Sequence, residues 1–226
     1  ETFWENGRLN LWSNVQFGEG GAGTFSDGKL NTLVKDKFGR NHEVLRIFAE
    51  HGAPESITYE SKPHIGTDVL TAVVKEMRKY ICAHGGEVRF HSQVTDIQTH
   101  SDNGQKILRK LKIYDSQKKE THLLDTDLAV FAIGHSARDT FSMLYHHGLP
   151  MQPKAFAVGV RIEHPQEMIN QDQYGKNYPS FLPAAPYKLT ANLDNGRGVY
   201  TFCMCPGGYV VNASSEEHRL AVNGMS

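Results

Sequence analysis

Five glycines lie within residues 18–28, and three of them, Gly18, Gly20 and Gly23, are spaced as G-x-G-x-x-G. In a dinucleotide-binding fingerprint this spacing brings backbone N–H groups to a pyrophosphate at the start of a helix. The motif has that meaning only between a hydrophobic strand and a helix. Here the preceding LNLWSNVQ is too polar for a buried strand, and the following TFSDGKLNT has no helical stripe. The sequence therefore argues against a classical fingerprint.

The same glycine-rich loop could still contact a flat or anionic ligand. Glycines let the backbone come close to a ligand, and successive N–H groups can form an anion-binding nest. The alternative is a flexible surface loop, but so many glycines are costly to order. Two aromatic residues, Phe17 and Phe25, are placed to hold the loop. Its polar side chains, which would add contacts to a ligand, are Thr24, Ser26, Asp27 and Lys29.

Composition excludes several other kinds of site. With 24 basic and 25 acidic residues the net charge is −1, which argues against a nucleic-acid partner. No apolar run is long enough for a membrane span, and no signal peptide is visible. The twelve histidines lack ligand spacing, so no metal site is expected. Three cysteines, Cys82, Cys203 and Cys205, favour a reducing compartment, and we expect the cytoplasm.

Two helices are expected before residue 86. Residues 41–50 carry one apolar face, and Pro54 follows as a stop. Residues 67–84 form a longer helix with Thr67 as its N-cap and Gly85 after its end. The expected buried faces consist of Val44, Ile47 and Phe48 in the first helix, and Leu70, Val73, Val74, Met77 and Ile81 in the second.

The segments that follow predict a small sheet and then a buried strand. Short strands are expected at residues 87–91, 93–99, 106–114 and 120–124, with a hairpin turn at DNG, residues 102–104. The apolar run DLAVFAIG, residues 127–134, is typical of a strand buried on both faces of a parallel sheet. A short helix should follow it and end at Gly148, with His146 and His147 at its exposed end. Beyond Pro150, residues 154–165 and 198–211 look strand-like and flank an irregular, proline-rich stretch.

Several motifs, taken in chain order, resemble one family. They are GEGGAGTFSDGKLNT, KPHIGTDVL, AIGHSARDTF, FAVGVRIEHPQ, YTFCMCPGGYVVNASSEE and the closing NGMS. Together they resemble the uncharacterised FAD-dependent dehydrogenases of bacteria and plastids, relatives of the geranylgeranyl-reductase-like flavoproteins. The resemblance extends over essentially the whole chain. It implies that the chain is an internal fragment whose true G-x-G-x-x-G segment lies upstream. It also implies the plastid stroma as the location if the protein comes from a plant or alga.

The resemblance also implies a fold and a reaction. The fold class is α/β: a partial FAD/NAD(P)-binding, Rossmann-like domain over residues 1–149, with a β-meander insertion at about 93–124, followed by a β-rich substrate domain over residues 150–226. The reaction is hydride transfer at flavin N5 to or from an unknown small organic substrate, with NAD(P)H as a possible electron partner. The alternative is a non-catalytic ligand-binding domain that keeps the flavoprotein fold.

By the same resemblance, a set of residues would contact FAD. The loop would lie near the isoalloxazine, where Lys29 or the amides of residues 21–24 would stabilise the reduced flavin. The backbone of Val94 would meet the adenine, although Val94 also fits an ordinary core position. Gly134 would let the chain approach the pyrophosphate or ribose, unless the segment is simply a strand end. The complete set is Gly20, Gly21, Ala22, Gly23, Thr24, Ser26, Asp27, Lys29, Val94, Gly134, His135 and Ser136.

The catalytic residues are not identified by these motifs. The candidates are Lys29, Cys203, Cys205 and Arg161. On a strand, the side chains of Cys203 and Cys205 would point to one face, either as small buried hydrophobes or as part of the substrate site. A redox pair is less favoured because the spacing is C-x-C and not C-x-x-C. Arg161 would anchor an anionic substrate or pair with Glu163.

Overall fold

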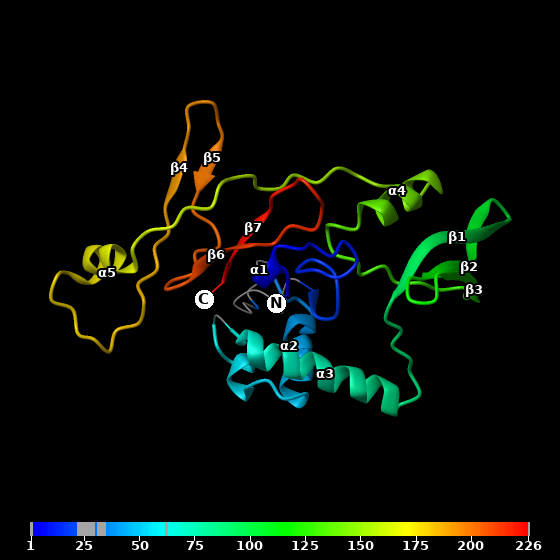
Figure 1. Ribbon diagram of the computed structural model, residues 1–226, viewed down its shortest axis with the longest axis horizontal. Coiled ribbons are helices and arrows are strands. Elements are labelled where there is room, and N and C mark those ends of the chain that lie inside the picture. The colour runs from blue at the N-terminus through cyan, green and yellow to red at the C-terminus, as the bar shows by residue number, and fades with distance from the viewer. Residues whose placement is uncertain (1, 22–29, 31–34, 62, 226) are drawn as a thin grey trace. The chain divides into compact units, whose positions relative to one another are not determined.

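The computed structural model describes residues 2–21, 30, 35–61 and 63–225 (Figure 1). The chain divides into two compact units, Glu1–Tyr80 with Gly159–Ser226, and Ile81–Val158. The architecture is mixed α/β, and every described strand pair is antiparallel. The parallel strands expected in the first half do not occur among the described residues. The Rossmann-like assignment and the domain boundary at residue 150 stay predictions.

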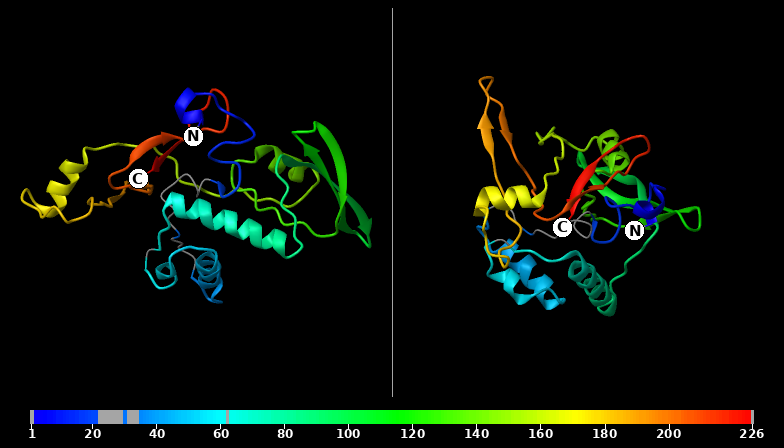
Figure 2. Two further views of the ribbon diagram at one scale, coloured as in Figure 1. Left: turned by 60° about the horizontal axis from the view of Figure 1, so that its bottom comes forward. Right: turned by 60° about the vertical axis from the view of Figure 1, so that its left-hand side comes forward.

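The core of the first unit lies between its helices. The helical elements are α1 (Thr2–Asn6), α2 (Arg40–Glu50), the 3-10 helix η2 (Glu55–Thr58) and α3 (Thr67–Ala83), and Figure 2 shows α2 beside α3. The buried cluster consists of Ala53, Ile57, Ile65, Leu70 and Val73, with Leu30, Leu45, Phe48, Val69, Val74 and Met77 packed against it. Both predicted helices are therefore confirmed, and each one packs apolar side chains in or against this cluster.

Three details of the helix prediction are wrong. Val44 is 47% exposed, because α2 turns Leu45 and Phe48 to the core instead. Ile81 is 45% exposed at the end of α3. The first i to i−4 hydrogen bond of α3 runs from the Leu70 N–H to the Gly66 carbonyl, so Gly66 and not Thr67 takes the N-cap position.

The second unit is built on an antiparallel meander. Its strands are β1 (Ser92–Asp102), β2 (Gln105–Asp115) and β3 (Glu120–Asp125), in the order β1-β2-β3. The predicted hairpin turn is confirmed, since Asn103 and Gly104 have φ of 47° and 80°, as a type I′ turn requires. The predicted strand at residues 87–91 is wrong. His91 has a φ of 56°, which interrupts the extended chain before β1 begins.

Helix α4 (Arg138–His146) is confirmed, but the strand expected before it is not. Residues 127–134 are irregular, with Leu128 78% and Val130 86% exposed. Residues 154–165 are also irregular, and Phe156, Val158 and Val160 are each more than 80% exposed. Alternating or continuous apolar residues favour a strand, but a strand also needs a neighbour for its N–H and C=O groups. Neither segment has such a neighbour among the described residues.

The C-terminal part contains short strands and one helix that the sequence did not predict. Two hairpins form there, β4 (Thr190–Asn192) with β5 (Gly198–Tyr200), and β6 (Tyr209–Asn212) with β7 (Val222–Met225). The strand-like pattern over residues 198–211 is thus correct at its two ends, while residues 201–208 form a loop. Helix α5 (Gln166–Tyr174) was missed, although Pro165 before it, Glu167 in its first turn and Gly175 after it are helix-boundary signals.

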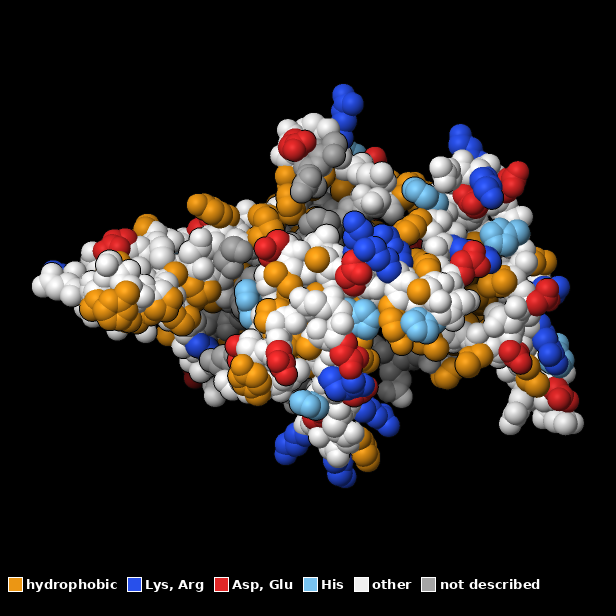
Figure 3. Space-filling view, turned by 90° about the horizontal axis from the view of Figure 1, so that it is seen from below, with side chains coloured by type: hydrophobic (Ala, Val, Ile, Leu, Met, Phe, Trp, Pro, Cys, Tyr) orange, Lys and Arg blue, Asp and Glu red, His pale blue; other side chains and the backbone are white. Residues whose placement is uncertain are grey.

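The surface has the mixed character that its composition suggests. Figure 3 shows acidic and basic side chains interspersed with exposed hydrophobic ones over the face that it draws. Among the described helices, none is both long enough and apolar enough to cross a bilayer.

The helical core yields a test of its packing. Ile57 is 0% exposed, so Ile57→Ala should lower the free energy of unfolding by about 2–5 kcal/mol, through lost burial and a new cavity. Ile81→Ala removes the same atoms from a side chain that is 45% exposed and should cost much less. Urea unfolding followed by circular dichroism measures both changes, and equal losses would show that Ile57 is not a core residue.

Candidate functional site

The glycine-rich segment begins with an exposed left-handed turn. Gly18, Gly20 and Gly21 have φ of 128°, 82° and 54°, and the Gly21 N–H donates to the Gly18 carbonyl at 3.1 Å. A Cβ added to Gly18 or Gly21 would meet nothing within 4 Å, so the backbone here is open to a ligand. These dihedrals are strained for any residue with a side chain. The remaining predicted residues of this loop, Ala22, Gly23, Thr24, Ser26, Asp27 and Lys29, lie outside the described residues.

The segment before this turn is anchored to the end of β6. The indole N–H of Trp4 donates to the Asn212 carbonyl at 2.8 Å, and the side-chain amide of Gln16 donates to the Ala213 carbonyl at 2.9 Å. Val15 and Ala213 are both buried. The β6–β7 hairpin therefore holds the start of the glycine-rich segment, although about two hundred residues separate them.

The other predicted cofactor residues lie in the second unit. Val94 is the third residue of β1 and pairs with Ile113, next to a register shift between Val94 and Asp96. Gly134 has a φ of 67°, and a Cβ added to it would meet nothing within 4 Å. His135 and Ser136 hydrogen-bond each other through Nδ1 and Oγ at 2.6 Å. Gly134 thus has the open backbone that a close approach requires, while Val94 also serves as an ordinary sheet residue.

Side-chain contacts join β1 to α4. The Gln93 amide donates to Asp139 Oδ2 at 2.6 Å, and His147 Nε2 lies 2.6 Å from Asp96 Oδ1. The Lys106 ammonium donates to the His147 carbonyl at 2.5 Å. These bonds bring the start of β1, where Val94 lies, to the helix that follows residues 134–136. His147 lies at the end of its helix, as predicted, but it contacts Asp96 and is only partly exposed.

The pKa of the Asp96 carboxyl is lowered in this contact. The hydrogen bond from His147 is the largest cause that lowers the pKa of the Asp96 carboxyl below its ordinary value. The N–H of Ile97 and the charges of His147 and Lys112 act in the same direction, and partial desolvation opposes them. The charged form of Asp96 is therefore the one that holds α4.

A second cluster forms where residues 201–208 meet β7. Arg161 Nη1 donates to the Cys203 carbonyl at 2.6 Å, and Nη2 lies 3.4 Å from Asn223 Oδ1. Cys205 Sγ lies 3.7 Å from the Cys203 carbonyl oxygen. The predicted pairing of Arg161 with Glu163 is wrong, since the Glu163 carboxylate accepts the Val210 N–H at 2.7 Å instead.

The predicted geometry of the two cysteines is also wrong. Cys203 and Cys205 lie in a loop and not on a strand, and Cys203 adopts a φ of 53°. Both are partly buried, and neither forms a disulfide. A φ in the left-handed region is uncommon for a residue with a side chain. Such backbone strain clusters at ligand-binding and active sites.

A helix that the sequence did not predict supports the same loop. Gln166, the first residue of α5, accepts the Gly207 N–H at 2.8 Å and donates to the Ala185 carbonyl at 3.1 Å. Asn170, one turn later, accepts the Ala185 N–H at 2.8 Å. Ala185 is fully buried, so these two side chains satisfy a backbone segment that water does not reach.

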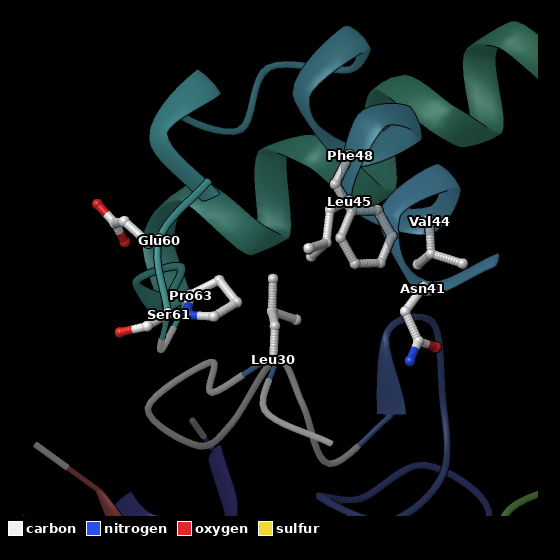
Figure 4. Close-up of a pocket in the computed structure, with 8 residues that line it drawn as sticks. All are labelled: Leu30, Asn41, Val44, Leu45, Phe48, Glu60, Ser61 and Pro63. Carbon is white, nitrogen blue, oxygen red and sulfur yellow. The ribbon is translucent and has the colours of Figure 1, made fainter. Parts of the chain in front are cut away.

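A separate pocket of about 310 Å³ lies beside α2 (Figure 4). Its lining is mainly apolar, with Glu60 and Ser61 at one side and Asn41 at the other, and it consists of Leu30, Asn41, Val44, Leu45, Phe48, Glu60, Ser61 and Pro63. The Leu30 N–H donates to the Pro63 carbonyl at 3.0 Å and closes one wall. None of the predicted cofactor residues that the structure describes lines this pocket. Over the described ranges, no group of three His, Cys, Asp or Glu side chains is arranged to hold a metal.

Comparisons with known proteins connect part of this chain to flavoproteins. Residues 155–226 match the family model described as FAD-dependent protein, C-terminal domain-like. The whole chain is 54% identical over 229 residues to a protein of Clostridium beijerinckii whose printed name is "Uncharacterized protein". The chain spans 40% of the length of that relative. The family match covers the Arg161 cluster and the β6–β7 hairpin, and it supports an FAD-dependent family.

The Asp96–His147 contact predicts a pH dependence. Because the folded pKa of Asp96 is lowered, its contribution is present above about pH 4, the ordinary range of an Asp carboxyl, and is lost as the pH falls through the lowered value. The pair is partly exposed, so Asp96→Asn should cost only about 0.2–1 kcal/mol at neutral pH, and less near pH 3.

Hydrogen exchange of the α4 amides as a function of pH measures this effect. Asp102→Asn, at the far end of the same strand, makes the same change of charge and should leave α4 unaffected. Equal exchange of α4 in the wild-type and Asp96→Asn proteins at neutral pH would contradict the role assigned to this contact.

Proposed function

We propose that the protein is an FAD-dependent oxidoreductase and that this chain supplies part of its cofactor site and part of its substrate domain. The observation that carries the proposal is the match of residues 155–226 to the C-terminal domain of FAD-dependent proteins. The open left-handed glycines at Gly21 and Gly134 support it, because they fit a chain that lies against a flat cofactor. We place the protein in the cytoplasm, with an organic molecule as its substrate.

Different residues of this chain would contact different parts of the cofactor. Residues 20–29 would lie at the isoalloxazine, and Gly134 with His135 and Ser136 would lie at the pyrophosphate or ribose. Val94 would offer its backbone to the adenine. When bound, FAD supplies hydride transfer at N5, with NAD(P)H as the proposed electron partner. The amides of residues 21–24 and the Lys29 ammonium would stabilise negative charge at the N1–C2=O edge, and Cys203 and Cys205 would border the substrate.

The first prediction of this proposal concerns the full-length protein. When purified, it should be yellow and show flavin absorption, and NADH or NADPH should bleach that absorption under anaerobic conditions. Flavin absorption without reduction by either nucleotide would remove NAD(P)H as the electron partner. A colourless protein that stays colourless after FAD is added would contradict the proposal. Bound flavin that no organic oxidant can reoxidise would favour a non-catalytic binding domain.

The second prediction tests the open backbone at Gly134. Gly134→Ala in the full-length protein should weaken FAD binding by about tenfold or more, because a Cβ would stand where the cofactor approaches. The matched control is Gly39→Ala. Gly39 has a φ of 69° against 67° for Gly134, and it too has nothing within 4 Å of an added Cβ.

Both alanine substitutions carry the same backbone strain of about 1–2 kcal/mol. Fluorescence titration of the apoprotein with FAD measures the affinity, and urea unfolding measures the strain. Equal FAD affinities of the two variants would place Gly134 away from the cofactor.

A further inference from the structure

Arg161 is a half-buried cation whose recorded partners are neutral. Its two hydrogen bonds go to the carbonyl of Cys203 at 2.6 Å and to the side-chain amide of Asn223 at 3.4 Å. In the part of the chain that the structure describes, it forms no ion pair with a carboxylate. The nearest acid along the chain, Glu163, is engaged by the Val210 N–H at 2.7 Å. The positive charge of Arg161 is therefore not compensated within this cluster.

The guanidinium also keeps unused hydrogen-bonding capacity. An arginine carries five N–H donors in a planar fork, and two of them are used here, one in a long contact. Partial burial makes an unmatched charge unfavourable and strengthens its attraction to an anion. The fork suits a carboxylate or a phosphate, which it can bind through two parallel hydrogen bonds.

The surroundings of Arg161 are built by close backbone packing. A Cβ added to Gly224 would lie 2.7 Å from Cys205 Sγ and 3.2 Å from Arg161 Nη1. A Cβ added to Gly208 would lie 2.5 Å from the Met225 carbonyl oxygen. Two glycines thus let β7 and the 201–208 loop close around the guanidinium. The left-handed φ of Cys203 occurs at the same place and belongs to the residue whose carbonyl holds Arg161.

We infer that Arg161 binds an oxyanion of the substrate, a carboxylate or a phosphate, at the junction of the 201–208 loop with β7. The identification of this anion as part of the substrate rests on the proposed oxidoreductase function. The binding of an oxyanion at Arg161 rests only on the charge and packing of the cluster. Asn223 and the Cys203 carbonyl act as positioning groups, because they orient the fork.

Calorimetric titration of the full-length protein with acetate, benzoate and inorganic phosphate tests this inference. At least one of these probes should bind to the wild type, and Arg161→Gln should weaken that binding by about tenfold or more, as the loss of a charge-assisted hydrogen bond predicts. Arg161→Lys should restore part of it. A preference for acetate and benzoate, or for phosphate, tells which oxyanion the site takes. Arg197→Gln, in the exposed β4–β5 hairpin, removes the same charge elsewhere and should have no effect.

Asn223→Asp separates binding from a purely structural role of Arg161. It places a carboxylate against Nη2 without changing the shape of the side chain. This carboxylate should compensate the charge of Arg161 and abolish oxyanion binding in a folded protein. Unchanged binding in Asn223→Asp, unchanged binding in Arg161→Gln, or no binding of any probe to the wild type would each overturn the inference.

The FAD content of the same samples distinguishes the two proposals. Loss of bound FAD in Arg161→Gln would assign the arginine to the cofactor and overturn its role toward the substrate. A protein that never binds FAD but binds an oxyanion through Arg161 would contradict the proposed oxidoreductase function. The same result would support the anion site.

Discussion

The close approach of β7 to the loop at residues 201–208 is the contact on which the candidate site depends. Gly208 and Gly224 make it possible, because any Cβ at either position would collide with backbone or with Cys205. One side of the β6–β7 hairpin then meets Arg161, and the end of β6 receives Trp4 and Gln16, which precede the glycine-rich turn. A single two-stranded hairpin thus holds two distant parts of the chain. Loss of its packing would disturb both.

In the second unit, side-chain contacts and not glycines hold two elements together. Its meander offers one partly buried face, and α4 is fixed to β1 by hydrogen bonds to Gln93 and Asp96. Each bond is partly exposed and individually weak, so the docking relies on several acting together with the buried Leu144 and Thr140. The helix in turn fixes the end of the loop that contains Gly134. This arrangement explains how an irregular segment can be held in a defined position.

The charged side chains differ in how far a partner compensates their charge. Most of the described ion pairs are exposed contacts between near neighbours, such as Glu43 with Arg46, and contribute little. Arg161 differs because it is half-buried and its partners among the described residues are all neutral. That difference, rather than the number of polar residues in the cluster, is what makes the cluster a candidate for ligand binding. The family match of residues 155–226 covers the same cluster.

Local patterns in the sequence determined the elements that depend on local interactions. The helices at α2, α3 and α4 and the Asn103-Gly104 hairpin follow from apolar periodicity, stop residues and turn dihedrals, all of which act within a few residues. The tertiary structure decided what depends on a distant partner. The apolar runs at residues 127–134 and 154–165 are not strands, since neither has a neighbouring strand in the part of the chain that the structure describes. Arg161 turned to Cys203 and Asn223 instead of Glu163, because its partners come from a loop and a strand that periodicity cannot bring together.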